Sequence, residues 1–418
     1  MPIKRRTVLK GVGALAAAAF GGPAVAQTVL DEFLQAPRRG SWNDQFDAKA
    51  SATGARVQTN TPIFAPETAM HVERAIMAYQ NIVAQGGWPV VPAEKKLKLG
   101  VNDPHVQILR QRLMVSGDLA ANAGLSDSFD SFVDAALKRF QARHGLPSDG
   151  VTGRYTYAAM NVAAPVRLMQ LETNLVRLRA MHDALKERYV MVNIPAASIE
   201  AVENGRVVLR NTAVVGKADR QSPILYSKIN QIVINPYWNA PESIVRKDII
   251  PLMRKDPQYL TKNFIRILDS KGNEIDPLTI DWSTEEAAKL RFRQDPGKIN
   301  AMASIKIDFP NPHAVYMHDT PQQSLFTENE RFHSSGCVRV QNVRDLVTWI
   351  LQGTEGWNRQ RCEQTIQAGE NVFVKTGNPP GVHFTYVSAW SSDDGVVHLR
   401  DDIYGKDGAQ ELQLSSTL

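Results

Sequence analysis

The chain has 418 residues, of which 43% are hydrophobic and 22% are charged, and its formal net charge is +5. This length is sufficient for two or three domains with a sizeable core, and the composition is ordinary for a soluble globular protein. With only two cysteines, the chain cannot be a disulfide-dense scaffold.

The first 26 residues have the three parts of a secretory signal peptide. Met1–Lys10 carries four basic residues and no acidic one, Gly11–Phe20 is an alanine-rich apolar run, and the small residues A-V-A end at Ala26. The apolar run is too short to span a bilayer as a helix. The pair Arg5 and Arg6 within K-R-R-T-V-L-K is typical of a twin-arginine export signal. We therefore expect an exported, periplasmic protein.

Removal of this signal would lower the formal net charge to +1, because the signal carries four positive charges and no negative ones. The basicity thus belongs mainly to the signal. Nucleic-acid binding requires a basic patch, and the sequence does not favour it. Membrane association of the mature chain is not indicated either.

Residues 27–98 are predicted to be a polar lead-in followed by one scaffold helix. The lead-in carries Pro37, Gly40 and Gly54 and few apolar residues. The stretch Pro66–Gln85 then has apolar residues at helical spacing and stops at a pair of glycines.

Residues 99–163 are predicted to form a small separate module. Two helical stripes are followed by the turn sequence G-L-P-S-D-G, and a third short helix follows with Thr152 or Thr156 as its N-cap. The stretch A-L-K-R-F-Q-A-R-H-G-L-P-S-D-G-V-T-G resembles the peptidoglycan-binding domain, a three-helix module. The resemblance implies that this module holds the wall polymer.

Residues 164–188 have the most regular helical spacing in the chain, and at Tyr189 the pattern changes to alternation. Several short strands follow, two of them joined by an Asn204-Gly205 hairpin turn. Within this β-rich part, residues 241–293 are again helical and contain one short strand pair, which indicates an insertion between strands. We expect residues 189–408 to form one domain and residues 409–418 a frayed tail.

Two short apolar runs near residue 330 bring chemistry-bearing residues together. His318 ends the first run and Cys337 precedes the second, with a polar loop between them. A cysteine of ordinary pKa is only a few per cent thiolate at neutral pH, so it needs a nearby base or positive field. Gly336 permits unusual backbone dihedrals and close approach of a substrate. Arg339 shares a strand face with Cys337 if the run is extended.

The sequences H-D-T-P at His318 and S-S-G-C-V-R-V around Cys337 resemble the catalytic signature of the L,D-transpeptidases. By this resemblance the catalytic domain is mostly a β sandwich, Cys337 is the nucleophile, and His318 forms a thiolate–imidazolium pair with it. Many members have histidine two residues before the cysteine. Here Ser335 occupies that place, and His333 lies four residues before the cysteine.

The resemblance extends over residues 27–407, and the larger members carry a capping subdomain where this chain has its insertion. It implies an α+β multidomain protein that forms 3→3 peptidoglycan cross-links. The donor is a tetrapeptide stem, D-alanine is released, and the acceptor is the diamino acid of a second stem. Carbapenems are expected to acylate the cysteine, and no metal or organic cofactor is required.

Further residues near this site are candidates for supporting roles. Backbone N–H groups at Gly336 and Cys337 are expected to hold the oxyanion. Arg339 is a candidate clamp for a substrate carboxylate. Tyr316 and Asp319 flank the histidine and either orient it or line the substrate site, where Ser335 is also a candidate contact.

Alternatives remain open at this level. The acyl-enzyme could pass to water, as in an L,D-carboxypeptidase, or to a lysine of a wall-anchored protein, and the chain could also be a wall-binding scaffold with a dead site. A zinc site from His313, His318, His333 and Cys337 lacks a short-spaced ligand pair. A disulfide between Cys337 and Cys362 would silence the nucleophile, and Cys362 is expected to be a buried structural residue.

Overall fold

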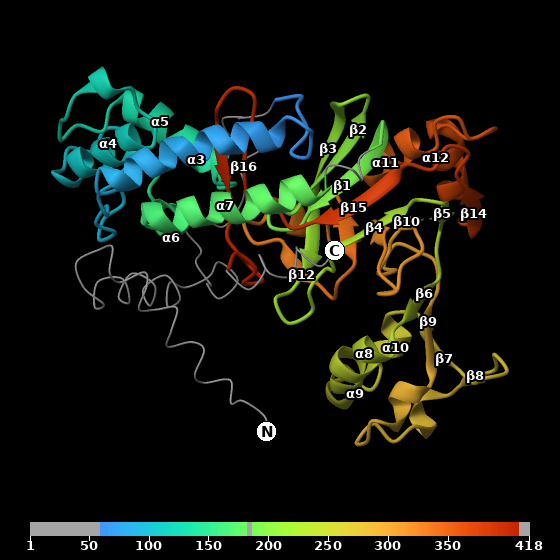
Figure 1. Ribbon diagram of the computed structural model, residues 1–418. Helices are drawn as coiled ribbons and strands as arrows, with labels where there is room; N and C mark the ends of the chain where they lie inside the picture. Colours follow the sequence, from blue (N-terminus) through green and yellow to red (C-terminus); the bar gives the residue numbers. More distant parts are fainter. Residues whose placement is uncertain (1–58, 182–185, 409–418) are drawn as a thin grey trace, which may run out of the picture. The chain divides into compact units, whose positions relative to one another are not determined.

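The computed structural model describes residues 59–181 and 186–408 (Figure 1). The predicted signal peptide, most of the lead-in and the predicted tail lie outside these residues. The described chain divides into two compact units. Among the described residues, the first contains 69–176 and 388–408, and the second contains 59–68, 177–181 and 186–387.

The first unit is mainly helical. Its elements are α3 (Thr68–Ala84), α4 (His105–Val115), η2 (Ala121–Ala123), α5 (Ser131–Arg143), α6 (Arg154–Met160), α7 (Ala164–Met181), β16 (Ala389–Ser391) and β17 (Val397–Leu399). The core of the predicted module is built from apolar residues at helical spacing, such as Leu109 and Leu113 on α4 and Val133, Leu137 and Phe140 on α5. The predicted helices are therefore confirmed.

One predicted helix cap in this unit is wrong. The N-cap position of α6 is held by Gly153, and no side chain caps the helix. Thr152 instead bonds the backbone of Leu97, accepting its N–H at 2.7 Å, and contacts the hydroxyl of Tyr157 at 2.9 Å. Thr156 lies inside the helix, where its hydroxyl contacts Gln141. Both threonines thus join segments of the module rather than begin the helix.

The second unit is built on an eleven-stranded sheet with the order β14-β5-β10-β11-β13-β3-β2-β1-β15-β4, in which β12 pairs with β3. Its strands are β1 (Arg188–Asn193), β2 (Ser198–Glu203), β3 (Arg206–Gly216), β4 (Leu225–Lys228), β5 (Gln231–Ile234), β10 (Ile305–Asp308), β11 (Met317–His318), β12 (Phe332–Ser334), β13 (Val338–Val340), β14 (Val372–Lys375) and β15 (Gly381–Thr385). Helices η7 (Gln323–Thr327), α11 (Val343–Ile350) and α12 (Arg359–Ala368) belong to the same unit.

Local sequence explains the turn between β2 and β3 and the start of α11. Asn204 and Gly205 have φ values of 51° and 73°, which is the backbone of the predicted two-residue hairpin turn between β2 and β3. Asn342 stands at the N-cap position of α11 as predicted, but its side chain makes no capping hydrogen bond because its backbone is left-handed, with φ at 51°. Asn342 therefore occupies the N-cap position without capping the helix through its side chain.

The predicted insertion forms a lobe of its own within the second unit, which we call the cap. It contains β6 (Trp238–Ala240), α8 (Glu242–Ile244), η4 (Val245–Ile249), α9 (Ile250–Lys255), α10 (Tyr259–Lys262), β7 (Ile265–Leu268), β8 (Glu274–Ile275), η5 (Pro277–Thr279), η6 (Glu286–Lys289) and β9 (Arg291–Gln294). Its four strands form a separate sheet, β6-β9-β7-β8. Its elements are grouped together in Figure 1.

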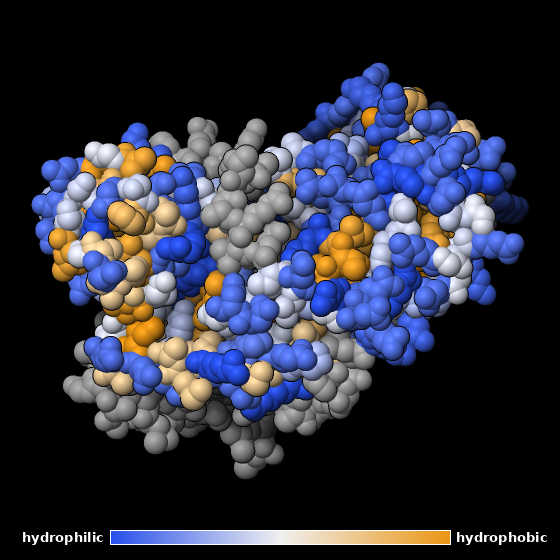
Figure 2. Space-filling model, turned by 90° about the horizontal axis from the view of Figure 1, so that it is seen from above, coloured by the Kyte–Doolittle hydropathy of each residue, from blue (hydrophilic) through white to orange (hydrophobic). Residues whose placement is uncertain are grey.

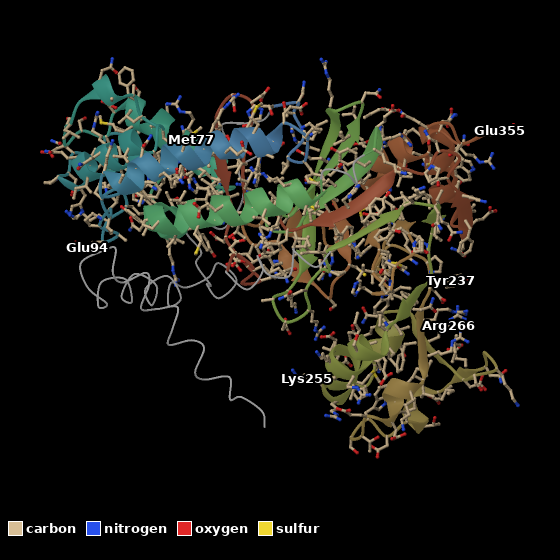
Figure 3. All side chains as sticks on the ribbon, viewed as in Figure 1. Met77, Glu94, Tyr237, Lys255, Arg266 and Glu355 are labelled. Atoms are coloured by element: carbon tan, nitrogen blue, oxygen red, sulfur yellow. The ribbon has the colours of Figure 1, made fainter. Side chains whose placement is uncertain are left out.

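The cap has its own apolar core, which includes Val245, Ile249 and Phe292. Its strands carry arginines in defined contacts: the Arg293 guanidinium lies 4.8 Å from the ring centre of Tyr237, and Arg266 pairs with Asp295. Figure 3 shows Tyr237 where the chain enters the cap and Arg266 on β7. Because it has a separate core, the cap can hold its shape independently of the large sheet.

The C-terminal segment differs from the sequence grouping. The prediction places residues 389–408 in the β-rich domain, whereas the structure groups them with the helical unit. The side chain of Asn174 on α7 binds both the hydroxyl and the backbone N–H of Ser388, at 2.8 and 3.0 Å. Gln170 on the same helix donates to the carbonyl of Arg400 at 2.8 Å.

The surface is predominantly hydrophilic on the face seen in Figure 2, where hydrophobic residues gather only in small patches. Over residues 59–181 and 186–408, none of the helices combines the length and the apolar run that a membrane crossing requires.

Candidate active site

Strands β11 and β13 bring the two predicted catalytic residues together. The strands are parallel, with Met317 opposite Val338 and His318 opposite Arg339. The N–H of Val338 donates to the carbonyl of Tyr316 at 3.0 Å, so Cys337 continues the pairing next to Tyr316. Because side chains alternate along strands, Tyr316, His318, Cys337 and Arg339 all lie on one face. The expected meeting of the two runs is confirmed.

Strand β10 adds two residues that the sequence analysis missed. It pairs antiparallel to β11, with Lys306 opposite His318. The ammonium of Lys306 lies 4.6 Å from the ring centre of Tyr316 and 3.0 Å from the carboxylate of Asp308. The same face therefore carries a row of Lys306, His318 and Arg339 across three strands, which we call the cationic row.

The imidazole of His318 is fixed by the next residue. Its Nδ1 lies 2.5 Å from the carbonyl oxygen of Asp319, and since a carbonyl only accepts, Nδ1 carries the proton. Nε2 is then the basic nitrogen. The carboxylate of Asp319 turns elsewhere and accepts from the hydroxyl of Ser304 at 2.6 Å. Asp319 thus orients the base through its backbone.

Burial favours the neutral form of both His318 and Cys337. It lowers the pKa of His318 to about 3, and the charges of Arg339 and Lys306 act in the same direction. Burial raises the pKa of the Cys337 thiol to about 11, although Tyr316 and the same two cations oppose the rise. The resting pair is a thiol and an imidazole. The expected thiolate–imidazolium pair stays a prediction for the occupied site.

Tyr316 connects the sulfur to the cap. Its hydroxyl lies close enough to Cys337 and to Trp238, the first residue of β6, for both side chains to influence its pKa. Burial raises the pKa of this phenol, and the neighbouring sulfur adds to the rise, so the hydroxyl remains a donor. Trp238 is a third residue that the sequence analysis missed.

The loop before the nucleophile needs glycine. Gly336 has φ at 112°, and a Cβ there would lie 3.3 Å from the carbonyl oxygen of Gln221. The N–H of Gly336 donates to the hydroxyl of Ser334 at 3.2 Å, so this predicted oxyanion donor is already engaged. The carbonyl of Gly336 accepts a hydrogen bond from the hydroxyl of Ser222 at 2.8 Å.

Arg339 has hydrogen-bonding capacity to spare. Its Nη1 donates to the side chain of Gln322 at 2.6 Å, and its Nε is buried without a hydrogen-bond partner. Burial lowers the pKa of this guanidinium, while the Cys337 sulfur opposes that effect. A half-buried arginine without a carboxylate partner suits a ligand that supplies one.

The remaining candidates make other contacts. The hydroxyl of Ser335 accepts from Arg220 at 2.9 Å, and His333 contacts the carboxylate of Glu328 and the carbonyl of Glu330 at 3.1 and 2.7 Å. The two cysteines are each free, and Cys362 is buried as expected.

For the zinc alternative, the part of the chain that the structure describes contains no group of three or more histidine, cysteine, aspartate or glutamate side chains placed to hold a metal ion.

Comparison with known families assigns both predicted modules. Residues 187–361, which include the whole face described above, match the model of the L,D-transpeptidase catalytic domain, and residues 102–160 match the model of the peptidoglycan binding domain. This chain carries an L,D-transpeptidase catalytic domain. The family is a class of cysteine-dependent acyltransferases, so the resemblance seen in the signature is confirmed at the level of the domain.

A Haemophilus influenzae protein whose name assigns it to the L,D-transpeptidases is 36% identical over 242 residues, which are 57% of this chain and 48% of that protein. The chain therefore matches about half the length of this relative.

Solved L,D-transpeptidases from Stackebrandtia nassauensis and Xylanimonas cellulosilytica are 13% and 16% identical, with TM-scores of 0.25 and 0.23. They cover 71% and 70% of this chain, and 96% and 99% of their own chains are matched. The domain assignment does not rest on them.

Proposed function

We propose that this protein is a periplasmic L,D-transpeptidase that forms 3→3 peptidoglycan cross-links through an acyl-enzyme on Cys337. The observation that carries the proposal is the shared face of β11 and β13, on which His318 and Arg339 lie beside Cys337 within a transpeptidase domain. The peptidoglycan-binding module supports the wall polymer as the substrate.

In the first half-reaction, Nε2 of His318 accepts the thiol proton and the sulfur attacks the carbonyl carbon of the third stem residue. Collapse of the tetrahedral intermediate breaks the bond to D-alanine, whose amine takes the proton from the imidazolium. The product is a thioester. The Tyr316 hydroxyl, close to the sulfur, supports the thiolate as it forms.

In the second half-reaction, the side-chain amine of another stem's diamino acid attacks the thioester carbonyl. His318 accepts the proton of that amine, the thiolate leaves, and the proton returns to the sulfur. The new amide is the cross-link. Atoms and charges balance without a metal or an organic cofactor.

Substrate binding supplies the condition under which the ion pair forms. The charges of Lys306 and Arg339 disfavour a protonated His318. A donor carboxylate at Arg339 would offset this positive charge and make the imidazolium easier to form. Arg339 is thus proposed as the clamp, while Tyr316, Asp319 and Ser335 shape the site. For the oxyanion, the N–H of Cys337 remains the proposed donor, since that of Gly336 is engaged by Ser334.

The test is mass spectrometry of products after the protein without residues 1–26 is incubated with disaccharide-tetrapeptides. A dimer joined between two third-position residues, absent with Cys337→Ala, is expected. A tripeptide without dimer would indicate an L,D-carboxypeptidase, and neither product would indicate a dead wall-binding scaffold. Persistence of the dimer in Cys337→Ala would exclude the proposed nucleophile.

A carbapenem provides an independent probe of the nucleophile. It should add its mass to Cys337 in the native protein and do so far more slowly in His318→Gln, because the thiol then lacks its base. If neither protein is labelled, the cysteine is not an acyl acceptor. Labelling at equal rates would show that the thiol is acylated without His318.

A further inference from the structure

The loop after β3 is tied to the backbone beside the nucleophile. It turns back so sharply that a Cβ at Gly216 would lie 2.3 Å from the carbonyl oxygen of Arg220. The hydroxyl of Ser222 accepts from the N–H of Gly216 at 3.0 Å and donates to the carbonyl of Gly336 at 2.8 Å. The position of this loop and that of the cysteine loop therefore depend on each other.

Arg220 extends this connection to the cap. Its guanidinium binds both carboxylate oxygens of Asp248, at 2.5 and 3.1 Å, and also donates to the hydroxyl of Ser335 at 2.9 Å. Asp248 lies in η4, a π-helical segment of the cap. Such segments interrupt helices mostly at functional sites. Arg220 thus joins the cap to a residue two positions before Cys337.

A second contact fastens the cap on the other side of the sulfur. The side chain of Trp238 on β6 lies close to the hydroxyl of Tyr316, which in turn lies close to Cys337. The cap has its own apolar core, so these contacts restrict its movement as a body. The Arg220 contact is the charged one of the two, and it can be altered without changing Cys337, His318 or Tyr316.

We propose that Arg220 is a positioning residue whose contacts to Asp248 and Ser335 hold the cap over the acyl-enzyme and thereby favour an amine over water as the acceptor. This inference rests on the proposed function. A cap that is held closed excludes water from the thioester, whereas a released cap admits it. Ser335, where many family members have histidine, serves here as the point of attachment.

The competing explanation is an ion pair that affects neither the cap nor the site. Ion pairs near the surface often contribute little, and the Asp248 side chain is 38% exposed. The two explanations differ in one respect. Only the positioning role predicts that loss of Arg220 changes the partition of the acyl-enzyme between amine and water.

The experiment compares Arg220→Gln with Arg246→Gln in the purified protein supplied with disaccharide-tetrapeptides. Arg246 is a matched control, because it pairs with Glu242 and Glu285 inside the cap. We expect Arg220→Gln to lower the ratio of dimer to tripeptide by about threefold or more, which is the size of a modest net hydrogen-bond contribution, and Arg246→Gln to leave it unchanged. An unchanged ratio in Arg220→Gln would overturn the proposal.

Charge reversal separates the contact from the residue itself. Arg220→Asp should lower the ratio, and the double variant Arg220→Asp with Asp248→Arg should restore much of it, since the pair is rebuilt in the opposite sense. If the double variant is no better than Arg220→Asp alone, the contact to Asp248 does not set the partition.

Hydrogen exchange gives a readout that does not require turnover. Arg220→Gln should increase amide exchange in residues 334–337 relative to both the native protein and Arg246→Gln, with α11 as the internal reference for a folded domain. Because Arg246 itself lies in η4, exchange in η4 is compared with the native protein alone. Exchange in residues 334–337 equal to that of the native protein would refute the attachment. If the native protein gives no dimer and no tripeptide, the proposed function fails, and the exchange result still decides whether Arg220 positions the cap.

Discussion

The base of this site lies between two cations. Lys306 and Arg339 flank His318 in the cationic row, and burial adds to their effect on its pKa. The two cations stabilise the neutral form of the imidazole, whereas at the Cys337 thiol they oppose the effect of burial and favour the thiolate.

The first prediction concerns Lys306. Its charge lowers the pKa of the Cys337 thiol, so Lys306→Met should slow alkylation of that thiol by iodoacetamide at pH 8 to 9 by about threefold to tenfold. Lys306→Arg should restore the rate. Peptide mapping by mass spectrometry distinguishes Cys337 from the buried Cys362. Lys375→Met, on β14, is the control. Equal rates in all variants would show that Lys306 does not act on the thiol.

A second prediction follows from the buried base. Since the pKa of His318 is about 3 in the folded protein and about 6.5 when unfolded, the unfolded state binds more protons below pH 6.5. The free energy of unfolding should therefore fall as the pH falls from 6.5 towards 3. In His318→Gln this dependence should be shallower by up to about 1.4 kcal/mol per pH unit. Urea unfolding between pH 4 and 7 measures it, and parallel curves for both proteins would contradict it.

At this scale the sequence identifies the proposed catalytic residues but not their electrostatic environment. Cys337 and His318 stand out because glycine, serines and short apolar runs surround them. Lys306 lies in the run I-K-I-D, which gives no sign of the strand it pairs with. Its position opposite His318 depends on register between segments that are separate in sequence.

Among the elements, helix starts show how far local patterns are informative. Helix α5 begins after Asp130, whose carboxylate accepts from the N–H groups of Phe132 and Val133 at 3.0 Å each. Helix α11 begins after Asn342, whose side chain makes no such bond. Residue type predicted a cap at Asn342, but the left-handed backbone there turns the side chain away from the first turn.

The third prediction tests the N-cap of α5, Asp130. Asp130→Ala removes both capping hydrogen bonds and an ion pair with Arg110, and should lower the free energy of unfolding by about 1–2 kcal/mol. Thermal unfolding followed by circular dichroism measures the loss. Ser131→Ala, at the next position, should change stability by less than about 0.5 kcal/mol. A similar loss of stability in both variants would mean that the N-cap hydrogen bonds of Asp130 are not its cause.

The strands of the large sheet were predictable one by one, because alternation and the Asn204-Gly205 turn are local signals. The order of these strands in the sheet was not predictable. Neighbours such as β5 and β14, or β1 and β15, come from distant parts of the sequence. The catalytic face exists only in that order, since β10, β11 and β13 must be adjacent for the cationic row to form.

At the scale of the molecule, the helical unit is assembled from two separate stretches of chain. The sequence does not indicate that this unit is discontinuous, because V-H-F-T-Y-V-S-A-W looks like one continuous strand. In the structure, β15 ends at Thr385 and the chain crosses at Ser388 into the first unit. Polar side chains on α7, buried and spaced for a helix, receive it: Asn174 and Gln170.

The fourth prediction tests this attachment. Asn174 is fully buried, and Asn174→Ala would leave the N–H of Ser388 without its partner, so the free energy of unfolding should fall by roughly 1–3 kcal/mol. Thermal unfolding of the whole chain measures it. Glu172→Ala, at an exposed position of the same helix, is the control and should be nearly neutral. Equal stability of both variants would show that the segment is held by other contacts.

This discontinuous unit has a consequence for the order of events during synthesis. A ribosome makes the helices of the first unit early and β16 and β17 last, with the whole sheet-bearing unit between them. Asn174 and Gln170 therefore meet Ser388 and Arg400 only after more than half of the protein has been translated, and the second unit can fold before the first unit is complete. Premature termination near residue 387 would yield a folded second unit and a first unit that lacks β16 and β17.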